Sequence, residues 1–68
     1  MLSQFIQNNF NKTVDIRYRF DRTVGTLQDR GHRGYRINNW LFGIKDVSSF
    51  GYIDEQPYIV INEVEYVK

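Results

Sequence analysis

The chain of 68 residues contains no cysteine, a single histidine, a single proline and no long hydrophobic run. Without cysteine it has no disulfide, thiol nucleophile or zinc–thiolate site. His32 and the nearby Asp29 would supply at most two ligands, so we expect no metal site. No segment approaches the roughly 20 apolar residues of a membrane span. Met1 is followed by neither a basic region nor an apolar run, so we expect no secretory signal and a cytoplasmic protein.

Residue types that carry catalysis are also sparse. Ser48 and Ser49 have no base near them in the sequence, and the carboxylates Asp54 and Glu55 fall in a predicted turn. A chain this short has little room for a water-excluding pocket. We therefore expect a protein that is not an enzyme, with no cofactor and no small-molecule substrate.

The length predicts one small domain that spans residues 1–68. A chain near this size buries only about 60% of its unfolded surface, so its stability should be low. Five Phe, five Tyr and one Trp partly offset this limit. Each aromatic side chain can bury roughly 150–250 Å².

Positive charge is concentrated in one segment, because all six arginines fall between Arg17 and Arg36. Residues 1–45 contain eight Lys or Arg and three Asp, a net charge of +5, whereas residues 46–68 contain one Lys and five acidic residues, a net charge of −4. The overall charge of +1 therefore conceals a dipolar chain. Such a segment could meet a polyanion or an acidic partner. The pI of about 8.1 is below the value of about 9 that is typical of nucleic-acid binders.

The first residues predict the chain's one helix, at about residues 2–10. Leu2, Ile6 and Phe10 recur every four residues with Phe5 beside them, and Ser3 can cap the start. A helix of about eight residues does not persist alone in water. It must therefore dock on the rest of the domain.

From residue 13 the hydrophobic period changes to two, which predicts strands. Apolar residues from Val14 to Phe20 alternate with charged ones, and Asp21-Arg22 then predicts a tight turn. Further strands are predicted at residues 23–29, 35–40, 41–53 with a break near Asp46, 58–61 and 64–67. Gly25, inside the second of these strands, indicates a bulge, a sharp bend or a close backbone approach.

These elements predict a mainly β fold: a short N-terminal helix packed on a small, strongly bent antiparallel barrel of five to six strands. Closure would remove the exposed edges that so small a sheet cannot protect. A bulge at Gly25 would switch which residues of its strand face inward. The predicted core contains Val14, Ile16, Tyr18, Phe20, Val24, Ile37, Ile59 and Ile61, with Leu2, Ile6 and Phe10 from the helix.

The segment Val24-Gly25-Thr26-Leu27-Gln28-Asp29, preceded by a helix and a strand, resembles the opening of Sm-like domains. The same layout is similar to SH3-like barrels and to the small YolD-like proteins of Firmicutes and their phages. The resemblance implies the bent barrel. Sm-like proteins read RNA with an aspartate and an asparagine in the next loop and an Arg-Gly pair near the end. Here that loop has no asparagine and the tail has no Arg-Gly, so neither the base-binding pocket nor ring assembly is carried over.

Two binding functions remain open from the sequence, and the first is nucleic-acid binding. Arginines of the first strand and of the glycine-flanked loop would contact the phosphate backbone while Tyr35, with His32, stacks on bases. The alternative is that the arginines form ordinary ion pairs with Asp15, Asp21 or the tail acids, each worth ~0–1 kcal/mol. The predicted nucleic-acid site comprises Arg17, Arg19, Arg30, Arg33, Tyr35 and Arg36.

The second function is a protein-interaction or regulatory module of a phage or mobile-element type. Three consecutive large residues, Trp40, Leu41 and Phe42, cannot all face one core in a strand, so we expect at least one to lie outward or to cover the helix. In the interaction-module hypothesis this exposed patch is an aromatic anchor for a partner. The acidic C-terminal strands are a further candidate surface, and the charge dipole permits head-to-tail self-association. The alternative is that Trp40 closes one end of the barrel under the helix.

Overall fold

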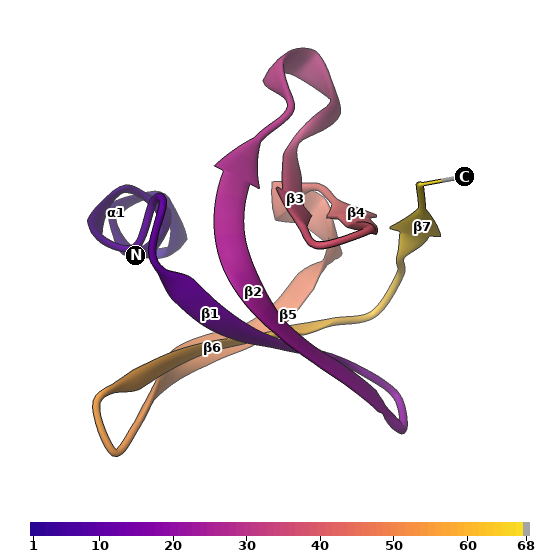
Figure 1. Cartoon of the computed structure of the whole chain (residues 1–68). Helices are drawn as coiled ribbons and strands as arrows, with labels where there is room; N and C mark the ends of the chain where they lie inside the picture. Colours follow the sequence, from indigo (N-terminus) through magenta and orange to yellow (C-terminus); the bar gives the residue numbers. More distant parts are fainter. Residues whose placement is uncertain (68) are drawn as a thin grey trace.

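A computed structural model describes residues 1–67, except for the side chain of Arg33 (Figure 1). Its elements are α1 (Leu2–Asn8), β1 (Thr13–Tyr18), β2 (Asp21–Asp29), η1 (Gly31–Arg33), β3 (Tyr35–Ile37), β4 (Trp40–Phe42), η2 (Ile44–Asp46), β5 (Val47–Ile53), β6 (Gln56–Ile61) and β7 (Glu65–Tyr66), where η marks a 3₁₀ turn. The predicted mainly β fold with an N-terminal helix is confirmed. Within residues 1–67, no helix has the length and apolar character needed to cross a bilayer.

The strands form one seven-stranded mixed sheet in the order β5-β6-β1-β2-β3-β4-β7. β1 and β6 run parallel, whereas the other neighbouring pairs are antiparallel. In the described residues β5 and β7 are the two ends of this order, so the hydrogen-bonded sheet does not close. The expectation of an antiparallel barrel of five to six strands is therefore wrong in strand number, direction and closure. Hydrophobic alternation predicts where strands lie, but it does not predict which strands become neighbours.

β2 turns the sheet through a bend because its two halves have different partners. Residues 21–26 pair with β1, and residues 27–29 pair with β3. Gly25 lies just before the change of partner, and a Cβ atom there would lie 2.7 Å from Cγ of Asn38. The Asn38 amide donates to Oγ1 of Thr23 at 2.8 Å and to the carbonyl of Val24 at 3.1 Å. Gly25 therefore marks a close approach in a bent strand whose register continues without a bulge.

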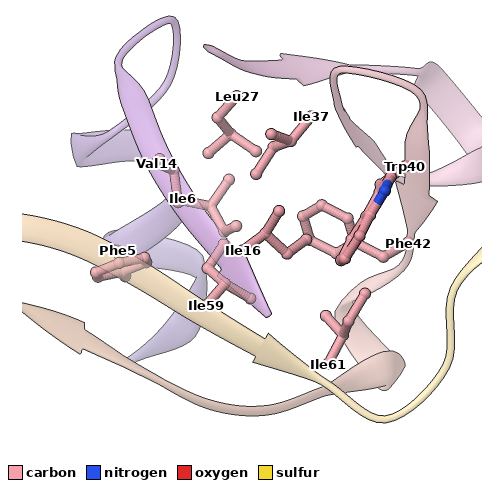
Figure 2. Close-up of a cluster of buried hydrophobic side chains, with 10 residues drawn as sticks. All are labelled: Phe5, Ile6, Val14, Ile16, Leu27, Ile37, Trp40, Phe42, Ile59 and Ile61. Atoms are coloured by element: carbon pink, nitrogen blue, oxygen red, sulfur yellow. The ribbon is translucent and has the colours of Figure 1, made fainter. Parts of the chain in front are cut away.

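The core lies on the concave side of this bent sheet (Figure 2). Ile16 of β1, Leu27 of β2, Ile37 of β3 and Ile59 of β6 are fully buried, as is Val14. The buried cluster comprises Phe5, Ile6, Val14, Ile16, Leu27, Ile37, Trp40, Phe42, Ile59 and Ile61, with Leu2 and Tyr18 packed against it. Burial is thus confirmed for Ile6, Val14, Ile16, Ile37, Ile59 and Ile61 among the predicted core residues.

Three predicted core residues are exposed instead. Phe20 is fully exposed, because β1 ends at Tyr18 and the tight turn falls at residues 19–20 rather than at 21–22. Val24 is 44% exposed, because the register turns Gly25 and Leu27 toward the core. Phe10 is 37% exposed, because α1 ends at Asn8 and Phe10 leaves the apolar stripe.

The helix docks on β5 through aromatic contacts. The Phe5 ring lies 5.0 Å from the Phe50 ring and 5.3 Å from the Tyr52 ring, measured between centroids. Asn9, which is buried, donates from its side chain to the Phe5 carbonyl at 2.8 Å and to the Tyr52 hydroxyl at 2.9 Å. The asparagine therefore ends the helix and ties it to the sheet, as a short helix requires.

The core position of Ile59 predicts a large effect of its truncation. Ile59→Ala should lower the free energy of unfolding by about 2–5 kcal/mol, since it leaves a cavity between β1, β5 and β6. A domain this small has little more stability than that to lose. Urea denaturation followed by Trp40 fluorescence measures the change. Ile53→Ala, at a position that is 51% exposed, is the control and should cost less than about 0.5 kcal/mol. Equal effects of the two changes would contradict the central position of β6.

Candidate binding surfaces

The structure separates the arginines of the predicted nucleic-acid site into two groups. Arg17 lies in β1 and Arg19 in the turn of the β1–β2 hairpin, whereas Arg30 directly follows β2 and Arg36 of β3 pairs with Gln28, near the far end of β2. Figure 1 shows the hairpin turn and η1 at opposite ends of β2. A straight strand of this length would span roughly 25 Å. The Arg33 side chain lies outside the described part of the structure. The described members of the set therefore do not converge on one surface.

Arg17 is joined by an arginine that was not among the predicted site residues. Arg22 of β2 is the direct cross-strand partner of Arg17. Nη2 of Arg17 lies 3.2 Å from Oδ2 of Asp15, and Nε of Arg22 lies 3.0 Å from both carboxylate oxygens. Sequence reasoning missed Arg22 because it placed this residue in the turn. The ion pairs found among the described side chains both use Asp15, and neither uses an acid of the tail.

Asp15 is buried between its two partners, at 3% exposure. Burial by itself raises the pKa of this carboxyl, but the hydrogen bonds and charges of Arg22 and Arg17 outweigh it, so the pKa of Asp15 is lowered from its ordinary value of 3.8. The same pair raises the pKa of the Arg22 guanidinium. The carboxylate thus stays ionised and holds both arginines in defined positions.

Residues 18–22 form the end of the hairpin, which we call the hairpin tip. Two aromatic residues, Tyr18 and Phe20, alternate there with arginine in the sequence. The Arg19 guanidinium lies over the Tyr18 ring, with Cζ 5.1 Å from the ring centroid. Arg19 has a left-handed backbone with φ of 56°, which turns the chain into β2. The next residue, Phe20, has 104% of its reference surface exposed. A large apolar side chain is thus fully hydrated at the tip of a projecting hairpin.

The predicted base-stacking residue is not on this surface. Tyr35 of β3 is half-buried and packs against Phe42, with ring centroids 6.1 Å apart. Nε of Arg36, its neighbour, donates a hydrogen bond to the Asn38 carbonyl. Tyr35 is therefore partly committed to the core, and stacking on a base would require the ring to leave this contact.

Trp40, Leu41 and Phe42 do not form an exposed patch, contrary to the interaction-module hypothesis. Their exposed fractions are 7%, 9% and 2%. Trp40 and Phe42 share the inner face, and Leu41 points to the other face between Arg36 and Glu65 in register. The Trp40 ring stands perpendicular to the Tyr66 ring with centroids 5.9 Å apart, so its aromatic partner is β7 rather than the helix. The short strand β7 was predicted, but its pairing with β4 was not.

An open groove of about 870 Å³ lies between η1, η2 and the segment before β7. Its apolar lining includes Tyr35, Phe42, Ile44 and Val64, and its charged lining includes Lys45, Asp46, Glu63 and Glu65. Among the side chains that the structure describes, no ion pair involves these three acids. We call this site the acidic groove. Sequence reasoning noted the acids but could not place them around a cavity.

No three His, Asp or Glu side chains of the described residues gather as ligands for a metal ion. No known family model matches the chain. No curated protein and no solved structure shows significant similarity to it. Any function must therefore be inferred from the surfaces themselves.

The Asp15 cluster predicts an acid-dependent stability. Since the folded pKa of Asp15 is lowered, its contribution is complete above the ordinary pKa of 3.8 and is lost as the pH falls through the lower folded value. Asp15→Asn should remove this dependence and cost about 1–2 kcal/mol at neutral pH, because a charge-assisted hydrogen-bond acceptor is replaced. Urea denaturation at a series of pH values measures both effects.

The matched control for this change is Asp54→Asn, in the exposed β5–β6 turn. Asn tolerates the left-handed backbone at this position, where φ is 50°. The control should retain the neutral stability and the acid-dependent loss of the unchanged protein. If Asp15→Asn retained both as well, the carboxylate would not be the group that holds Arg17 and Arg22.

Proposed function

We propose that this chain is a non-catalytic protein-interaction module and that the hairpin tip is its recognition element. The observation that carries the proposal is the full exposure of Phe20 between Arg19 and Arg22. Aromatic residues and arginine are enriched at the centres of protein interfaces, where they carry most of the binding free energy. Covering this ring would remove apolar surface that the isolated domain leaves in water.

The arrangement of the arginines also favours protein binding, because contacts within the hairpin already position their side chains. Asp15 accepts hydrogen bonds of 3.0 and 3.2 Å from Arg22 and Arg17. The Arg19 guanidinium stacks on the Tyr18 ring. Side chains that are already ordered lose less conformational entropy on binding. A partner with an apolar pocket bordered by carboxylates would complement this surface.

Nucleic acid is the weaker candidate for the same surface. Affinity for nucleic acid comes largely from the number of phosphates that lysine and arginine neutralise. The hairpin carries Arg17, Arg19 and Arg22 against Asp15 and Asp21, a net charge of only +1. The remaining described arginines of the predicted site lie at the other end of β2. A nucleic acid would therefore meet only a small excess of positive charge at the hairpin.

The test is selection of binding sequences from a displayed random-peptide library by the immobilised domain. We expect recovery of peptides that combine apolar and acidic residues. Their affinity should fall about tenfold or more in Phe20→Ser, as at an interface hot spot. Ile53→Ser removes another exposed apolar side chain, at the β5–β6 turn, and should retain the affinity.

Fluorescence anisotropy with short single- and double-stranded oligonucleotides is the second arm. Oligonucleotide binding that weakens steeply with salt, together with no peptide whose binding depends on Phe20, would overturn the proposal in favour of nucleic acid. Peptides that bind Phe20→Ser as well as the unchanged domain would also overturn it, because recognition would then lie elsewhere.

A further inference from the structure

The acids of the acidic groove take no part in the ion pairs of the hairpin. The acids of the acidic groove, Asp46, Glu63 and Glu65, form no ion pair with any described side chain, and Arg17 and Arg22 share the single carboxylate of Asp15. The groove lining contains Lys45 with Asp46, Glu63 and Glu65, a net charge of −2, whereas residues 15–22 have a net charge of +1, so the two places differ in sign. Figure 1 shows the hairpin turn and η1, which borders the groove, at opposite ends of β2. β2 separates the hairpin tip from η1, which borders the groove, so a molecule cannot insert its own hairpin into its own groove.

The two surfaces also complement each other in apolar character. The hairpin tip ends in the exposed ring of Phe20. The acidic groove contains Ile44, which is 44% exposed, and the half-buried Val64. Exposed apolar surface rimmed by polar residues marks interaction sites in soluble domains. A ring inserted beside Ile44 would bring the arginines of the hairpin toward Glu63 and Glu65 at the rim.

From this complementarity we propose that the partner of the hairpin tip is a second copy of this chain, which receives Phe20 and Arg19 in its acidic groove. The inference rests on the proposed role of the hairpin as a recognition element. Attraction between the basic tip and the acidic groove would orient the two copies, and burial of Phe20 would hold them together. Like-charged surfaces, tip against tip or groove against groove, would repel.

Such a contact is heterologous, because two different surfaces meet. Each copy keeps a free hairpin at one place and a free groove at another, so association continues until the chain of copies closes into a ring or grows as a filament. Added salt should weaken the contact, since part of the attraction is between exposed charges.

Sedimentation velocity over a concentration series, at low and high salt, tests the inference. The domain should gain mass with concentration, and less so at high salt. Phe20→Ser, which disables the hairpin, and Glu63→Lys, which reverses a charge of the groove, should each weaken association about tenfold or more. Both positions are exposed, so neither change should affect folding. The controls are Ile53→Ser, which also replaces an exposed apolar residue, at the end of β5, and Glu55→Lys, which also reverses an acidic charge, in the β5–β6 turn. Both should associate like the unchanged domain.

Mixing the two disabled variants gives the sharpest result. The intact hairpin of Glu63→Lys should enter the intact groove of Phe20→Ser, which forms a one-to-one dimer that cannot extend. A mixture that stays monomeric would overturn the inference, as would an unchanged domain that stays monomeric at every concentration. If peptide binding still depends on Phe20 in either case, only the identity of the partner is wrong. Association that Phe20→Ser leaves intact would overturn this inference, whereas peptide binding that Phe20→Ser leaves intact would overturn the proposed role of the hairpin.

Discussion

The parallel pairing of β1 with β6 joins the beginning of the chain to its end, and the rest of the fold depends on it. The register sets Ile16 against Ile59 and Tyr18 against Ile61 on the inner face. Closing so long a loop costs conformational entropy, which the burial of these isoleucines offsets. β6 also pairs with β5, and α1 docks on β5 through Phe5. The concave core in Figure 2 is built around this pair of strands.

The outer face of β1 determines the charge of the surface. Residues two apart in a strand point the same way, so Asp15 and Arg17 lie together opposite the core. The hairpin register then sets Arg22 beside Arg17, and one buried carboxylate holds both guanidiniums. The fold uses a local acid for this purpose and leaves the acids of the C-terminal segment around a separate groove. The acids of this groove therefore take no part in the Asp15 cluster.

The sequence was sufficient where a residue's position depends on its own strand. Val14 and Ile16 are buried because alternation with period two needs no knowledge of neighbouring strands. Phe20 continues the same alternation and yet is exposed, because the turn begins at Arg19, two residues before its predicted start. Leu41 sits on the outer face by register and is still buried. These outcomes depend on turn geometry and strand neighbours, which a single sequence does not state.

By itself, the sequence determined the mainly β class, the docked N-terminal helix, most of the inward-facing residues and the segregation of charge. Each follows from local periodicity or composition. Only the tertiary structure decided that β6 lies parallel to β1, that β7 packs Tyr66 on Trp40, and that the arginines divide between the two ends of β2. The physical reason is that the pairing of strands depends on the total apolar surface that all the inward-facing side chains of the sheet bury together. That total depends on residues far apart in the chain, so no local pattern contains it.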